Sequence, residues 1–170
     1  MNWFSWQVRG APAIAIVGCL SLAVELNRAD RFQTKEELDI FIKEKLDYLV
    51  TSRPTAVNIQ LSAEACKNLS SRLLRDNGVG ADAARQQIVD FLESTLAQDV
   101  QDNHKIGDFG AEHIVDAKPG RKVRVMTHCN TGSLATAGYG TALGVIRSLH
   151  KMEKLEHVYC TETRPYNQGK

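Results

Sequence analysis

The segment 121–140 constrains the fold most, because it joins an apolar run to a helix through a polar loop. The run at 123–126 has basic flanks and predicts a buried strand. The polar stretch 127–132 follows, and residues 139–152 are expected to form a helix. A second strand is expected at 157–161. Strand, helix and strand in this order predict a parallel βαβ unit.

Cys129 lies where the first of these strands ends. Ligands of parallel sheets bind at the carboxyl ends of the strands. Asn130 and Gly132 follow, and their backbone can approach an anion closely near a helix start. The second strand runs into another polar loop, 162–169, at the same sheet edge. The sequence therefore predicts an active-site edge centred on Cys129, against the more ordinary role of a free cysteine as a small core residue.

The glycines at 138–144 resemble a dinucleotide-binding fingerprint but have one residue too many before the third glycine. We expect them inside the helix, where they allow close helix–strand packing. A dinucleotide-binding oxidoreductase stays an alternative, which titration with NAD(H) or NADP(H) would test. The other three cysteines are expected to pack in the core: Cys19, Cys66 and Cys160.

The residues before this segment predict a helical domain. Residues 11–28 are apolar nearly all round, and Pro12 suits the first turn of a buried helix. The stretch imitates a signal peptide but is shorter than the ~20 apolar residues that a membrane span needs. Three further helices are expected at 34–52, 55–75 and 82–102, with a shorter one through Ile106, Phe109 and Ile114.

Apolar spacing predicts which face of each helix is buried. The second helix opens with a capping box from Thr34 to Glu37. For the helix at 34–52 the expected buried face is Leu38, Phe41, Ile42, Leu46 and Leu49. For the helix at 55–75 it is Val57, Leu61, Ala65, Leu69 and Leu73. For the helix at 82–102 it is Ile88, Phe91, Leu92 and Leu96.

The predicted fold class is α/β: a mainly helical domain, 1–118, followed by the first βαβ unit of an incomplete Rossmann-like domain, 119–170. Two parallel strands alone leave both sheet edges unpaired, whereas parallel sheets are normally buried on both faces. We therefore interpret the sequence as an incomplete form.

Composition excludes several classes of function. The 170 residues carry a net charge of +1, which gives no electrostatic footprint for nucleic acid or an anionic membrane. The four cysteines form no C-x-x-C pair, so neither a metal site nor a disulfide framework is expected. Reduced thiols fit a cytoplasmic protein.

Four motifs resemble the methylthioribose-1-phosphate isomerase family, which is related to the alpha, beta and delta subunits of the translation-initiation guanine-nucleotide exchange factor. They occur in the expected order at 9–13, 52–58, 127–136 and 164–169. The resemblance implies conversion of 5-methylthioribose 1-phosphate to 5-methylthioribulose 1-phosphate in methionine salvage, without a cofactor. The alternative is a non-catalytic regulatory subunit like the exchange-factor relatives.

The resemblance also implies roles for single residues. Cys129 matches one member of a catalytic pair, whose partner aspartate is expected after residue 170. Arg9 and Arg53 match phosphate ligands, with backbone donors at Gly10 and Ala11. Gln168 matches a substrate contact. A phosphorylated sugar is thus the expected substrate of a homodimer in the cytoplasm and nucleus, and residues 1–170 alone are expected to be weakly active or inactive.

Overall fold

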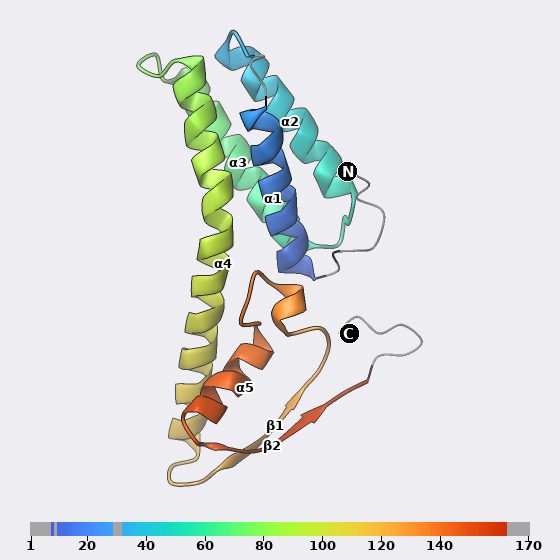
Figure 1. The fold of residues 1–170 in the computed structure, drawn as a ribbon, viewed down its shortest axis with the longest axis vertical. Helices are drawn as coiled ribbons and strands as arrows, with labels where there is room; N and C mark the ends of the chain where they lie inside the picture. Colours follow the sequence, from blue (N-terminus) through green and yellow to red (C-terminus); the bar gives the residue numbers. More distant parts are fainter. Residues whose placement is uncertain (1–7, 9, 29–31, 163–170) are drawn as a thin grey trace. The chain divides into compact units, whose positions relative to one another are not determined.

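The computed structural model describes residues 8, 10–28 and 32–162. These residues form five α-helices, a short 3-10 helix and two β-strands (Figure 1). They divide into two compact units, Met1–Leu96 and Ala97–Lys170, and each is described by itself. No described helix is both long and apolar enough to cross a membrane.

The first unit consists of α1 (Ala11–Asn27), α2 (Lys35–Thr51), α3 (Val57–Arg75) and the beginning of α4 (Ala81–Ala117). Sequence signals set the helix starts. Proline occupies the first turn of α1, and the Thr34 hydroxyl accepts a hydrogen bond from the N–H of Glu37 at 3.2 Å. The predicted first-turn proline and the Thr34 half of the capping box are confirmed.

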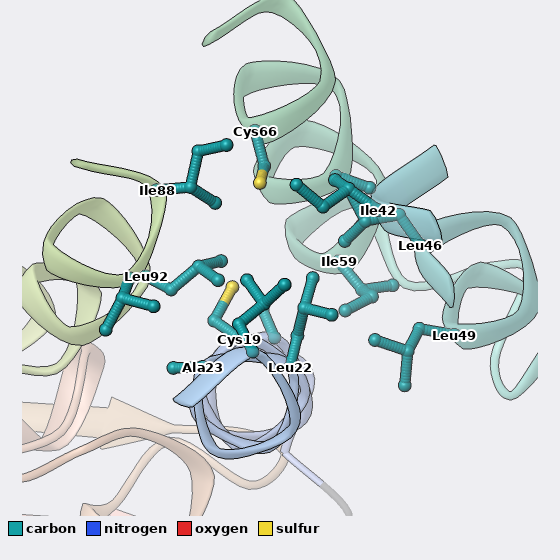
Figure 2. Packing of buried hydrophobic residues seen from close by; sticks show 14 of the residues in the cluster. Cys19, Leu22, Ala23, Ile42, Leu46, Leu49, Ile59, Cys66, Ile88 and Leu92 are labelled. Carbon is teal, nitrogen blue, oxygen red and sulfur yellow. The ribbon is translucent and has the colours of Figure 1, made fainter. Parts of the chain in front are cut away.

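The core of this unit lies between the four helices (Figure 2). The predicted face of α2 is confirmed, because Leu38, Ile42, Leu46 and Leu49 are buried. Each such side chain contributes about 1.5–3 kcal/mol when it leaves water. Figure 2 shows the labelled core residues: Cys19, Leu22, Ala23, Ile42, Leu46, Leu49, Ile59, Cys66, Ile88 and Leu92.

The predicted face of α3 was confirmed only toward the end of the helix, where Leu73 is buried and Leu69 packs against the core, and it was wrong at Val57, Leu61 and Ala65. Leu61 is 59% exposed, and the buried side chains are Ile59, Ala63, Cys66, Ser70 and Leu73. The expected residues recur every four positions, and such a row drifts around a helix of 3.6 residues per turn. The observed spacing alternates between four and three, which keeps the buried residues on one face.

Helix α4 is continuous through Ala117, so the expected break between two helices was also wrong. Residues 102–105, where the break was expected, contain no proline and lie within the continuous helix. Ile106 and Phe109 are exposed, at 47% and 67%. In this half of the helix the buried residues are Asn103, Gly107 and Ala111.

The second unit contains the end of α4, β1 (Val123–Thr127), α5 (Ala142–Lys151) and β2 (Leu155–Cys160). The strands pair in parallel, with Val125 opposite Val158 and Thr127 opposite Cys160. The predicted βαβ order is thereby confirmed. An apolar cluster that includes Ala111, Val123 and Leu149 forms the core of this unit.

Two details of the second unit differ from the prediction. Strand β1 is buried on one face only, since Met126 is 72% exposed. Helix α5 begins at Ala142 rather than Tyr139, which leaves Gly138 and Gly140 in the loop before it and only Gly144 within it. The reason is backbone geometry: Tyr139 and Gly140 both have positive φ, which an α-helix cannot contain.

Candidate active site

Cys129 lies in the loop directly after β1, with its side chain exposed. Its φ is 73°, in the left-handed region that a non-glycine residue rarely adopts. Holding an L-residue there costs about 1–2 kcal/mol. Such strain persists only where the surroundings enforce it, and it clusters at functional sites. The conformation presents an accessible thiol at the carboxyl edge of the parallel pair.

Polar contacts tie this loop to both strand ends. The N–H of Thr161 donates to the carbonyl of Thr127 at 3.3 Å, which extends the pairing beyond β2. The ring Nδ1 of His128 lies 2.6 Å from the hydroxyl of Thr161. The hydroxyls of Thr127 and Thr131 lie 3.2 Å apart. His128 is thus engaged with the neighbouring strand end, and we assign it no role as a base.

A close backbone approach fixes the far side of the loop. Gly140 has a φ of 88°, and a Cβ built there would lie 2.5 Å from the carbonyl oxygen of Thr131. The same Cβ would lie 2.9 Å from the Cα of Gly132. The missing side chain at Gly140 therefore allows the backbone there to pack closely against residues 131–132. Sequence reasoning missed this residue as part of the site; the signal was its place in a G-x-G pair before a helix.

The other three cysteines have two different environments. Cys19 and Cys66 are buried, as predicted. Burial raises the pKa of Cys66 from 9.0 to about 12 and also raises the pKa of Cys19, so both thiols stay protonated. Cys160 is exposed, and its predicted core role was wrong. It is the last residue of β2, opposite Thr127 at the same sheet edge as Cys129.

The remaining candidates that the structure describes lie in the first unit. Gly10 is buried and caps α1, and its carbonyl accepts the N–H of Ile14 at 2.8 Å. Ala11, the first residue of α1, packs against the core cluster. Arg53 is half-buried in the loop between α2 and α3, where its carbonyl accepts the N–H of Ala56 at 2.9 Å. This loop and the start of α1 lie at the same end of the unit (Figure 1).

Two predicted contacts, Arg9 and Gln168, lie outside the described residues. Within the described ranges, no group of three or more His, Cys, Asp or Glu side chains could hold a metal ion. The described candidates are therefore two separate features. One unit has a thiol at a strand end, and the other has a helix start at the same end as an arginine-bearing loop.

The fold and these sites define an α/β protein, mostly helical, with a small parallel sheet and an exposed thiol at its carboxyl edge. The chain belongs to the initiation factor 2 subunit family, whose sequence profile matches residues 7–170. Methylthioribose-1-phosphate isomerases of Drosophila pseudoobscura pseudoobscura and Drosophila persimilis are 54% and 53% identical to it. Each alignment covers 96% of this chain and 47% of the relative, so the chain spans about half their length.

Solved structures give the same relationship. The 5-methylthioribose 1-phosphate isomerase of Pyrococcus horikoshii OT3 matches 98% of this chain and 44% of its own length, with a TM-score of 0.79 and 33% identity. The delta subunit of translation initiation factor eIF-2B from A. fulgidus covers 98% and 46%, with a TM-score of 0.70 and 35% identity.

Proposed function

We propose that this chain supplies the Cys129 loop and the phosphate-binding residues of a methylthioribose-1-phosphate isomerase, acting in methionine salvage. The observation that carries the proposal is the exposed Cys129 thiol in a left-handed conformation at a strand end. The 54% identity to the methylthioribose-1-phosphate isomerase of Drosophila pseudoobscura pseudoobscura supports it.

The chemistry explains why such a thiol is useful. A phosphate on the anomeric oxygen prevents simple opening of the sugar ring, so a protonated group must assist cleavage of the ring C–O bond. Cysteine is among the side chains that act as general acids in enzymes. We assign this role to Cys129, working with an aspartate that the resemblance places after residue 170.

The phosphate is assigned to the first unit. The first turn of a helix has backbone N–H groups without intrahelical partners, and these favour an anion. Gly10 and Ala11 stand at such a start in α1, and the loop of Arg53 lies at the same end of the unit. A guanidinium can bind phosphate oxygens in a bidentate fashion. We include Arg9 and Gln168 as further substrate contacts on the basis of the resemblance.

The finer architecture is also a proposal. The parallel pair β1–β2, with α5 as its crossover, is consistent with the first βαβ repeat of a Rossmann-like sheet. The boundary between the helical and catalytic domains is proposed at residues 118–119, where α4 has just ended. We further propose a homodimer in the cytoplasm and nucleus that binds neither nucleic acid nor membrane. Sedimentation of the protein tests the homodimer, and imaging of the tagged protein tests its location in the cell.

The decisive experiment is a chimera in which residues 1–170 replace the matching segment of the Drosophila pseudoobscura isomerase. We expect turnover of methylthioribose 1-phosphate by the chimera and none by residues 1–170 alone. Cys129→Ala should lower kcat by at least about a hundredfold, the scale of a lost acid or base. Cys160→Ser is the matched control, because it removes the other exposed thiol at the same edge.

A non-catalytic subunit is the second candidate, supported by the 35% identity to the eIF-2B delta subunit. A folded chimera without turnover would favour it. Equal activity of the chimera and its Cys129→Ala variant would remove Cys129 from the mechanism.

A further inference from the structure

Two charged side chains hold the loop that follows the candidate catalytic cysteine. Asp99 of α4 accepts the N–H of Ala137 at 2.8 Å. Arg147 of α5 donates to the carbonyl of Tyr139 at 2.5 Å and to the hydroxyl of Ser133 at 3.0 Å. These are charge-assisted hydrogen bonds, which are about twice as strong as neutral ones. The loop is thus attached to two helices through two backbone groups and the Ser133 hydroxyl.

The Tyr139 side chain adds a second attachment. Its ring stacks on His104 of α4, with ring centroids 3.9 Å apart. Its hydroxyl lies 2.8 Å from the hydroxyl of Ser148, which donates to Asp108 at 2.8 Å. The tyrosine is therefore held at its backbone, ring and hydroxyl, and its left-handed φ of 61° is maintained by these contacts.

The anchored segment, residues 137–140, packs against the residues that follow Cys129. Gly140 contacts the backbone of Thr131 and Gly132. The N–H of Leu143, in the first turn of α5, donates to the carbonyl of Thr131 at 3.4 Å. A shift of the 137–140 segment must therefore move the backbone two residues after the cysteine.

Asp99 is itself oriented for this task. Its Oδ2 accepts a second hydrogen bond, from the side-chain amide of Asn103 at 2.9 Å. The same amide donates to the Asp99 carbonyl at 2.7 Å, and Asn103 is buried. A carboxylate fixed by a buried amide one turn away is pre-organised to receive the loop N–H.

We propose that Asp99 is a positioning residue, which acts through the 137–140 segment to keep Cys129 in its left-handed, accessible conformation. Asp99 contacts Ala137 rather than the thiol, so its effect is indirect. Only the consequence for turnover rests on the proposed function. The effect on the accessibility of the Cys129 thiol does not depend on the proposed function.

The first test measures alkylation of Cys129 by iodoacetamide in the 170-residue chain, in a Cys160→Ser background. In that background Cys129 is the single exposed thiol of the three that remain, and modification of buried Cys19 or Cys66 reports unfolding. Loss of a charge-assisted hydrogen bond in Asp99→Ala should slow alkylation of Cys129 about tenfold, because the released loop no longer keeps the thiol in its accessible conformation.

The matched control is Asp102→Ala on the same helix. Its carboxylate accepts a hydrogen bond from Gln98 within α4, at 2.8 Å. Asp99→Asn keeps an acceptor of about half the strength and should lower the alkylation rate only about threefold. This variant decides the matter if Asp99→Ala exposes the buried thiols. Rates equal to that of Asp102→Ala would overturn the proposal.

The second test uses the chimera. Asp99→Ala should lower kcat about tenfold while KM stays within about twofold, with partial rescue in Asp99→Asn. A rise in KM with unchanged kcat would overturn the positioning role. An inactive parent chimera would refute the proposed isomerase, and the alkylation result would stand by itself.

Discussion

Replacing Gly140 with alanine tests whether the loop beside Cys129 depends on a close backbone approach. Gly140 has a φ of 88°, and an added Cβ would lie 2.5 Å from the carbonyl oxygen of Thr131. The atoms that the added Cβ would overlap are backbone atoms, which cannot move aside as the end of a flexible side chain could. Gly120 is the matched control, because its φ is 73° and nothing lies within 4 Å of its added Cβ.

The two substitutions separate strain from overlap. An L-residue in the left-handed region costs about 1–2 kcal/mol, which is all that Gly120→Ala should lose. Gly140→Ala adds the cost of overpacking, about 1–3 kcal/mol. The expected loss at Gly140 is therefore about 2–5 kcal/mol, enough to displace residues 131–132 even where the unit stays folded.

Urea unfolding of the 170-residue chain, followed by far-UV circular dichroism, measures the two losses. Hydrogen-exchange mass spectrometry of peptides from residues 123–160 shows whether the second unit is the part that weakens. Alkylation of Cys129 should also become slower in Gly140→Ala. Equal losses for Gly120→Ala and Gly140→Ala would refute the argument, because they would show that the loop yields to the added methyl group.

Three further predictions concern the first unit. Arg53→Ala should raise the KM of the chimera about tenfold, and Arg53→Lys should recover part of that loss, because lysine lacks the bidentate fork; an unchanged KM in the alanine variant contradicts the phosphate role. Ile59→Ala should cost about 2–5 kcal/mol in urea unfolding, whereas exposed Leu61→Ala should stay within about 0.5 kcal/mol, and similar losses would contradict the observed face of α3. Stability should fall as pH rises from 9.0 toward about 12, because unfolded Cys66 ionises before the folded thiol; Cys66→Ala should flatten that slope, and an unchanged slope would contradict the pKa assignment.

Local patterns predicted the parts of the fold that local chemistry decides. The Thr34 cap of α2, the buried face of that helix and the strand–helix–strand order all follow from short-range rules and were confirmed. The face of α3 was mispredicted at Val57, Leu61 and Ala65, because two apolar rows on one helix compete and only the tertiary neighbours decide between them. Leu61 belongs to one row and Ile59 to the other, and the core lies on the side of Ile59.

The continuity of α4 also depended on information distant in the sequence. Gly107 and Gly110 weaken a helix by about 0.5–1 kcal/mol each relative to alanine. This half of α4 belongs to the second unit, and each glycine makes room for another segment of that unit. A Cβ on Gly107 would lie 2.7 Å from the Tyr139 ring, and one on Gly110 would lie 2.7 Å from Val145. The helix therefore contains the two glycines because other segments pack against it at those points.

The candidate site also has parts that local sequence predicts and parts that depend on residues distant in the sequence. The place of Cys129 could be predicted, because a strand end followed by polar residues is a local pattern. The roles of Cys129, Gly10, Ala11 and Arg53 as site residues stay predictions. The support of the loop could not be predicted, because Asp99 meets Ala137 across 38 positions of sequence. A search confined to the motif would thus find the thiol and overlook the carboxylate, and variants of α4 are where changes in Cys129 chemistry should first be sought.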